Sequence, residues 1–325
     1  MRGLLPLASI CCNVGEDGLA RRLLKEIMIV FLYLFGYVFR SKGIPVLAYH
    51  SIDDSGSLLS VAPEIFLAQM QYLKDHGYRS ITLGALCRLL RKNRSLPPKT
   101  VVISFDDGFR NNYEVVFPVL MKLGFTATLF PVTGCISGSM NWDKTPDVPN
   151  LQLLRWEEIQ EMADKGLEIG AHSLTHRNLC TVPIETARSE IMDSRREIES
   201  KIQRQVGVFA FPYGVYNDAV EEIVREAGFL GAVTMGFGKV KRRDDPFRLK
   251  RLNVTGISHV GPMAKMLFFK CCLFGTAGWY MALKDYLPSL VASSGLPDGY
   301  GEWRTGGRSV GGLTNLRRSG ESWNP

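Results

Sequence analysis

The sequence contains no C-x-x-C pair, and its seven cysteines are odd in number and include two vicinal pairs. These cysteines therefore predict neither a disulfide framework nor a zinc ribbon. Basic and aromatic residues are not gathered into one stripe, although the net charge is +7, so the sequence predicts no nucleic-acid partner. With 46% hydrophobic and 22% charged residues, the composition is that of a globular protein with a substantial core.

The sequence also lacks an uncharged apolar run of full membrane-spanning length. Residues 27–39 would rise only about 20 Å as a helix, against a hydrocarbon core of about 30 Å. Basic residues flank this run on both sides, so we expect a signal-peptide-like region, a short anchor or a helix packed on the domain. No small-residue cleavage site follows the run, which argues against its removal. Residues 266–283 contain Lys270 and two glycines, which favours an interfacial or packed helix. Together these segments predict a membrane-associated or cell-envelope protein with a membrane surface as a partner, while a cytoplasmic location stays open.

One pattern recurs between residues 44 and 256: a short β-branched run, an amphipathic stretch, and then a glycine followed by an apolar residue. The glycine is expected to take the left-handed conformation that ends a helix. Near-continuous apolar runs predict strands buried on both faces, and hence a parallel α/β sheet. Right-handed crossovers then leave a (β/α) barrel or a doubly wound sheet. The predicted strands are 44–49, 100–105, 126–132, 167–171, 206–211 and 231–235, and the helix-ending glycines are Gly77, Gly124, Gly166 and Gly228.

This pattern divides the chain into four predicted parts. Residues 1–43 form an N-terminal extension with a short apolar helix, and residues 44–256 form the α/β domain. Residues 257–292 form an apolar helical extension. Residues 293–325 are rich in glycine, serine and arginine and are expected to be disordered.

Polar residues follow four of the predicted strands directly at their carboxyl ends. Barrels and open parallel sheets place their active sites at this edge. An Asp-Asp-Gly sequence alone is typical of a turn, but the shared position of these residues favours a site. The residues are His50, Asp106, Asp107, His172, Pro212 and Tyr213.

The spacing of two histidines indicates a metal site. His172 and His176 are four residues apart, so both imidazoles can face one point. Two imidazoles and one carboxylate form a three-ligand set that leaves positions for water, as in catalytic zinc sites. Adjacent carboxylates disfavour each other's ionisation unless a cation is near. The sequence therefore predicts that one of Asp106 and Asp107 is a ligand and that the other is a general base.

The motifs SFDDG, HSLTH and FPYG, in this order, resemble those of the polysaccharide deacetylases of carbohydrate esterase family 4. These are NodB-like domains built as an incomplete (β/α) barrel, and the resemblance covers roughly residues 44–256. It implies a metal-dependent hydrolase that removes N-acetyl groups from the amino sugars of a polysaccharide or glycan precursor, with one divalent ion, expected to be Zn²⁺. It also implies that Asp106 is the general base, and that Asp107, His172 and His176 hold the metal. Pro212 and Tyr213 would form a wall of the site, with the Tyr213 N–H at the oxyanion.

The chain departs from the family pattern at two positions. Ala210 stands where many members have an arginine that orients the base, and Arg248 and Arg251 are the candidates to replace it. The late Leu-x-His motif is matched poorly by His259. The sequence VLAYHS instead resembles the early Tyr-His of the branch that deacetylates poly-N-acetylglucosamine, so His50 is assigned as the general acid.

The same motifs leave two other functions open. One is a non-catalytic envelope protein that binds glycans on the same barrel, which the missing arginine at Ala210 favours. The other is a metal-dependent esterase acting on O-acetylated glycans, because the same centre attacks either bond.

Overall fold

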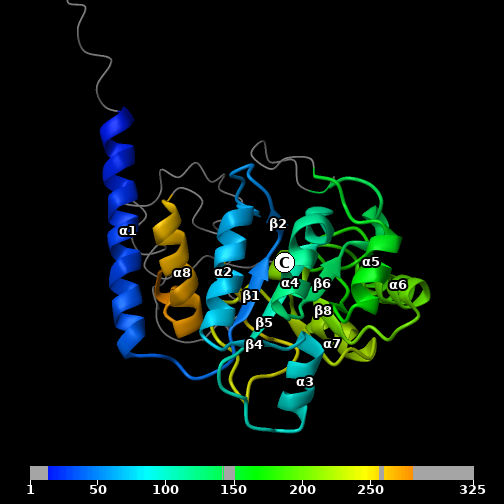
Figure 1. The fold of residues 1–325 in the computed structure, drawn as a ribbon. Helices are drawn as coiled ribbons and strands as arrows, with labels where there is room; N and C mark the ends of the chain where they lie inside the picture. The colour runs from blue at the N-terminus through cyan, green and yellow to red at the C-terminus, as the bar shows by residue number, and fades with distance from the viewer. Residues whose placement is uncertain (1–13, 141, 143–150, 256–259, 281–325) are drawn as a thin grey trace, which may run out of the picture.

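A computed structural model describes residues 14–140, 142, 151–255 and 260–280 (Figure 1). Within these ranges, parallel strands form the centre and helices surround them. The predicted tail 293–325 and His259 lie outside the described residues.

The strands form an incomplete (β/α) barrel, as predicted. The main sheet has the order β10-β1-β5-β6-β7, with β4 beside β5, and all of these pairs are parallel. Parallel bridges from Ala171 to Phe209 and from Val233 to Leu249 continue the ring through the pair β8–β9. The strands are β1 (Val46–Tyr49), β4 (Arg79–Ser80), β5 (Thr100–Asp107), β6 (Thr128–Pro131), β7 (Glu168–Ile169), β8 (Val208–Ala210), β9 (Gly231–Val233) and β10 (Leu252–Asn253), with the small pair β2 (Ser51–Ile52) and β3 (Ser60–Val61) beyond β1.

Four of the helices between the strands end at the glycines that the sequence predicts. The four glycines expected to end helices have φ values of 70°, 73°, 97° and 80°, in the left-handed region that closes a last turn. Single-turn helices occupy Asn112–Val116, Thr133–Cys135 and Pro212–Gly214. The longer helices of the barrel are α2 (Pro63–Asp75), α3 (Leu83–Arg91), α4 (Phe117–Leu123), α5 (Trp156–Asp164), α6 (Ile184–Ile202) and α7 (Asp218–Glu226).

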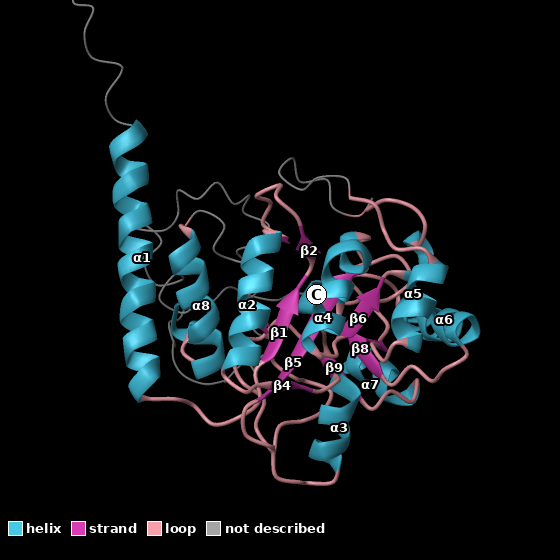
Figure 2. Cartoon of the chain, viewed as in Figure 1, coloured by secondary structure: helices cyan, strands magenta, loops and turns pink. Residues whose placement is uncertain are grey.

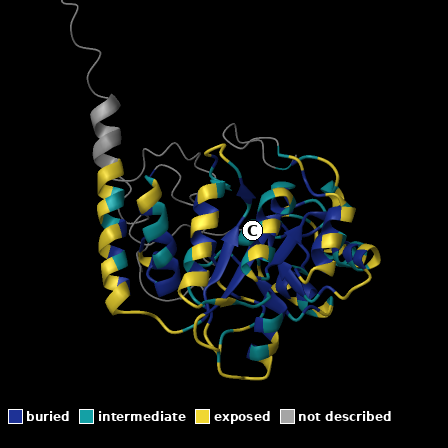
Figure 3. Ribbon diagram, in the orientation of Figure 1, coloured by how far each residue is buried: buried dark blue, intermediate teal, exposed yellow. Residues whose placement is uncertain are grey.

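Two hydrophobic clusters fill the barrel and its surroundings. The inner cluster joins strand residues such as Val102 and Val208 to Leu83 and Leu86 of α3. In Figure 2, α3 lies at the end away from the arrowheads of the strands. The outer cluster lies between the strands and the surrounding helices, and Figure 3 shows the strands as the buried centre. Because α3 closes one end, the carboxyl ends of the strands form the accessible end of the barrel.

Two further helices extend the domain on one side. α1 (Val14–Val38) contains most of the apolar run 27–39, and α8 (Pro262–Phe274) contains the first half of the run 266–283. α1 packs on α8, and α8 packs on α2, so the three helices lie side by side (Figure 1). Of the three expectations for 27–39, the structure shows a helix packed on the domain. Among the described helices, none combines the length and the apolar character needed to cross a bilayer.

Candidate active site

The end of β5 carries the two neighbouring carboxylates. Asp106 continues the inward-facing series of Val102 and Ser104, and it is 2% exposed. Strand alternation alone would turn Asp107 outward with Phe105, which lies in the outer cluster. Instead, Asp107 has a φ of 69°, a left-handed conformation that non-glycine residues rarely take. This turn directs the Asp107 carboxylate to the accessible end of the barrel.

The carboxylate of Asp107 faces both histidines of the HSLTH motif. Its Oδ1 lies 3.6 Å from His172 Nε2 and 3.4 Å from His176 Nε2, and all three residues are buried. Ligands held at 2.0–2.2 Å in a tetrahedral zinc site are separated by about 3.3–3.6 Å. Two of the three donor separations therefore match the edges of a zinc tetrahedron, and the residues present fit a divalent metal.

Backbone contacts hold the two histidines in place. His172 Nδ1–H donates to the Ala210 carbonyl oxygen at 2.8 Å, which leaves Nε2 to face the carboxylate. His176 has a φ of 58°, and the preceding loop is held by Glu190 of α6. The Glu190 carboxylate accepts bonds from the backbone N–H groups of Leu174 and Thr175. The loop is therefore fixed before any ligand binds.

Burial also keeps these imidazoles in the form that binds metal. Burial lowers the pKa of His172, and it lowers the pKa of His176 well below the usual value, an effect that the neighbouring His172 reinforces. A metal ligand must be neutral imidazole. The site consequently favours the metal-binding form of both side chains.

Arg251 takes the place of the arginine that many family members carry at position 210. Its Nη1 donates to Asp106 Oδ1 at 2.7 Å, and its Nη2 donates to Asp106 Oδ2 at 2.6 Å. The Arg251 side chain is 0% exposed, and its Nε donates to the Thr234 carbonyl oxygen. Burial acts to raise the pKa of Asp106, but the Arg251 guanidinium, together with the nearby His172 and His50, outweighs it and holds the pKa well below its usual range. Of the two arginines proposed from the sequence, Arg248 instead pairs with Glu221 and Asp218.

His50 is a further neighbour of the Asp106 carboxylate. Its Nε2 is 4.0 Å from Asp106 Oδ2, and its backbone carbonyl accepts a bond from Asn112 Nδ2. Burial lowers the pKa of His50 to about 4, although Asp106 acts against this. His50 is therefore neutral at neutral pH.

Comparisons with known proteins give the family of this chain. The family model described as "Polysaccharide deacetylase" matches residues 93–232. The Bacillus subtilis protein YxkH, whose name assigns it to polysaccharide deacetylases, is 30% identical over 212 residues, which are 65% of this chain and 71% of YxkH. The chain belongs to the polysaccharide deacetylase family. The predicted family and enzyme class are thus confirmed.

Three further deacetylases are similar to this chain: the first two support the branch, and the two solved structures support the fold. The poly-β-1,6-N-acetyl-D-glucosamine N-deacetylase of Staphylococcus epidermidis is 28% identical over 222 residues, 63% of this chain and 74% of that protein. The structure of IcaB from Ammonifex degensii matches with a TM-score of 0.60 and 25% identity, over 72% of this chain and 98% of that one. The structure of Streptococcus pyogenes deacetylase PplD in complex with acetate also gives a TM-score of 0.60, at 24% identity, over 69% of this chain and 97% of that one.

Aromatic side chains of this polysaccharide deacetylase surround His176. The Tyr213 ring lies 4.5 Å from the His176 ring, and the Trp142 ring stacks on it at 5.0 Å. Tyr213 has a φ of 59°, and a Cβ on the following Gly214 would lie 2.4 Å from Met235 N, so only glycine fits there. The predicted wall residues Pro212 and Tyr213 therefore lie at the site. Trp142 lies outside the predicted strands and outside the motifs SFDDG, HSLTH and FPYG, so the sequence does not predict it as a site residue.

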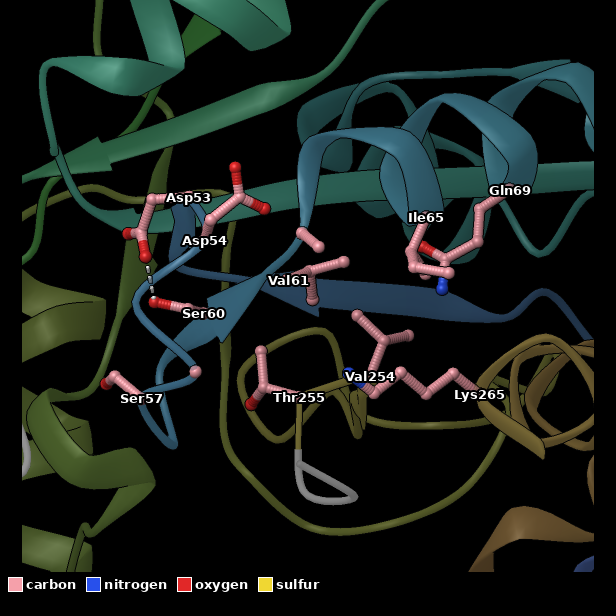
Figure 4. Close-up of a pocket in the computed structure, with 12 residues that line it drawn as sticks. Asp53, Asp54, Ser57, Ser60, Val61, Ile65, Gln69, Val254, Thr255 and Lys265 are labelled. Atoms are coloured by element: carbon pink, nitrogen blue, oxygen red, sulfur yellow. Dashed lines mark hydrogen bonds between the residues drawn. The ribbon is translucent and has the colours of Figure 1, made fainter. Parts of the chain in front are cut away.

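A hollow of about 140 Å³ opens between β2–β3, α2 and the start of α8 (Figure 4). Asp54 lies at its rim, and Lys265 reaches into it from α8. Gln69 of α2 is 2% exposed and accepts a bond from the Tyr49 hydroxyl. Val61, Ile65 and Val254 supply its apolar lining. The hollow thus combines polar groups with a small apolar surface.

Proposed function

We propose that the protein is a metal-dependent hydrolase that removes N-acetyl groups from the amino sugars of an N-acetylglucosamine polymer. The observation that carries this proposal is the donor set of Asp107, His172 and His176, placed directly beside Asp106 and His50. Several relatives are named for the N-deacetylation of poly-β-1,6-N-acetyl-D-glucosamine, which favours this substrate. We assign the activity to residues 44–256.

A divalent ion bound by Asp107, His172 and His176, with Zn²⁺ the expected one, would polarise the acetyl carbonyl and acidify a water molecule. Asp106 accepts the proton of the attacking water, while Arg251 keeps its carboxylate ionised and fixed in direction. The water oxygen bonds to the acetyl carbon, and the backbone N–H of Tyr213 donates to the resulting oxyanion.

His50 supplies the proton that the departing amine needs. Because the pKa of His50 is about 4, it is neutral at neutral pH and holds no proton to give at the start. Asp106 Oδ2 lies 4.0 Å from His50 Nε2, and Asp106 has just taken a proton from water. The proton therefore passes from Asp106 through His50 to the nitrogen. The carbon–nitrogen bond breaks, and acetate and a free amino sugar leave.

The decisive experiment measures acetate release from acetylated oligomers of β-1,6- and β-1,4-linked glucosamine, together with elemental analysis of the protein. We expect about one divalent ion per chain, loss of activity on chelation and recovery with zinc. Metal-loaded protein that releases no acetate from any N-acetylated glycan would overturn the proposal. O-Acetylated xylan in the same panel tests the esterase alternative. The non-catalytic alternative relied on Ala210, and it loses that support because Arg251 supplies the guanidinium.

We further propose that the hollow between β2–β3, α2 and α8 holds a second sugar residue of the polymer. Its polar groups suit the hydroxyl and amine groups of a glucosamine unit, and its apolar surface suits a sugar ring. Asp54→Ala and Lys265→Met should then raise KM for a pentamer but not for a disaccharide. An equal effect on both substrates would exclude this use of the hollow.

A further inference from the structure

The outer side of α1 carries a continuous row of exposed apolar side chains. Within the described residues, all but four of the exposed large hydrophobic side chains lie between positions 23 and 39. Six of them recur with the period of a helix and are 42–69% exposed. We call this row the outer α1 surface: Leu23, Ile27, Val30, Phe31, Leu34 and Val38. Figure 3 shows the exposed side of α1 facing away from the barrel.

The opposite side of α1 is fixed on α8. Ile29 and Leu32 are 0% and 3% exposed, and the Leu32 carbonyl accepts a bond from the Thr276 hydroxyl at 3.2 Å. A Cβ on Gly36 would lie 2.7 Å from Thr276 Oγ1, so the two segments meet at closest approach there. Lys239 donates to the carbonyl oxygens of Ser41 and Leu273, at 2.6 and 3.1 Å, and ties both segments to the barrel. The outer α1 surface therefore has a fixed direction.

A helix that is apolar around its whole circumference is normally covered on all sides. No charged residue lies between Ile27 and Phe39, yet α8 covers only one side of this stretch. The four remaining exposed large hydrophobics lie on other segments: Leu67, Ile184, Met263 and Trp279. Apolar rows of this extent on a protein surface mark a contact with a partner or a membrane.

The charges at the two ends of the row identify the partner. At one end Arg22 is exposed and pairs with Glu26 at 3.3 Å, and at the other end Arg40 and Lys42 are exposed. If two copies paired through α1 in parallel, the basic ends at Arg40 and Lys42 would face each other. An anionic lipid surface neutralises both ends at once, while its acyl region takes up the apolar side chains.

We propose that the outer α1 surface docks side-on onto a bilayer with anionic headgroups. The row enters the boundary between headgroups and acyl chains, and the basic residues at both ends contact the headgroups. Because α8 and α2 lie behind α1, docking in this direction leaves the barrel on the aqueous side of the interface.

Sedimentation of the full-length protein with vesicles tests the proposal, using phosphatidylcholine alone and phosphatidylcholine with phosphatidylglycerol. We expect binding to the mixed vesicles that weakens as salt is raised. Phe31→Ser and Leu34→Ser should each lower the partition coefficient by about tenfold, because each removes a large apolar side chain from the contact. The matched control is Leu67→Ser with Ile184→Ser, which removes exposed apolar side chains from α2 and α6 and should leave binding unchanged.

A charge series completes the test. Arg22→Gln with Lys42→Gln should weaken binding to the anionic vesicles only. The control, Lys122→Gln with Arg196→Gln, removes the same charge elsewhere on the surface and should weaken binding to these vesicles less. Thermal melting shows that the variants fold. Wild-type protein that does not sediment with anionic vesicles, or serine variants that bind as well as wild type, would overturn the proposal. Light scattering that shows a dimer, converted to a monomer by Phe31→Ser, would assign the surface to a second copy of the chain instead.

Discussion

Arg251→Met removes the buried guanidinium that faces the general base, and its effect on stability can be worked out from the structure. Arg251 is 0% exposed on its side chain and makes two bonds to Asp106, which is itself 2% exposed. Breaking such a buried pair costs about 3–5 kcal/mol, because the remaining charge is left without a partner. For a domain of this size, 1 kcal/mol shifts Tm by roughly 2–4 °C. We therefore expect Tm to fall by about 6–20 °C.

The same substitution should change the pH dependence of activity. Without Arg251, burial raises the pKa of Asp106, so the carboxyl is protonated over more of the acidic range. A protonated carboxyl cannot accept a proton from water. The acidic limb of the kcat/KM profile should accordingly move to higher pH. Arg251→Lys keeps the charge but loses the two-pronged geometry, so stability should be largely retained while kcat falls by about 10–100-fold.

Acetate release measured across pH, with Tm and zinc content, checks this reasoning. Arg248→Gln is the matched control, because Arg248 is the other arginine proposed from the sequence and pairs away from the site. Its kcat/KM and pH profile should match those of wild type. A folded Arg251→Met protein with kcat/KM within about threefold of wild type and an unchanged acidic limb would refute the positioning role of Arg251.

Three further outcomes follow from the site. Asp106→Asn should lower kcat by about 10²–10⁴-fold and leave the zinc content unchanged, whereas Asp107→Asn should lose zinc. If elemental analysis shows zinc loss for Asp106→Asn and not for Asp107→Asn, the two roles are exchanged. His50→Gln should slow amide hydrolysis far more than hydrolysis of an activated aryl acetate, whose leaving group needs no proton, and an equal loss on both would exclude His50 as the acid. Because the pKa of His50 falls from 6.5 to about 4 on folding, His50 has no effect on stability above pH 6.5, but the unfolded state binds its proton more readily below that pH, so the free energy of unfolding decreases as pH falls from 6.5 towards 4. The loss should be about 2 kcal/mol at pH 5, seen in urea unfolding at pH 5 and pH 8, and smaller in His50→Gln; identical pH dependence in both proteins would contradict it.

The features that the sequence predicted depend on local patterns. The strands are continuous apolar runs, and the helix ends are glycines with positive φ, so both can be recognised within a few residues. The meeting of His50, Asp106 and His172 follows from a general property of parallel sheets, whose carboxyl ends share one edge. The roles of these residues stay predictions, although the structure brings them together.

The remaining features depend on long side chains and irregular backbone. Arg251 reaches Asp106 from 145 positions away, along the inside of the barrel, and spacing alone could not separate it from Arg248. The left-handed turn at Asp107 redirects a side chain that strand alternation would point outward. Trp142 stacks on His176 from a loop that has no strand or helix pattern. None of these arrangements has a short-range sequence signal.

The surroundings of Ala210 show why the guanidinium that faces Asp106 cannot easily come from another position of the barrel. The Ala210 carbonyl holds His172, and the Ala210 methyl group lies buried in an interior where the Arg251 head already faces the acid. Introducing arginine at position 210 alone would bury two guanidinium groups side by side. Removing Arg251 first would leave the buried Asp106 carboxylate without its positive partner. An arginine at position 210 can therefore replace Arg251 only if both positions change together. We expect related deacetylases to carry this arginine at one of the two positions, and not at both or at neither.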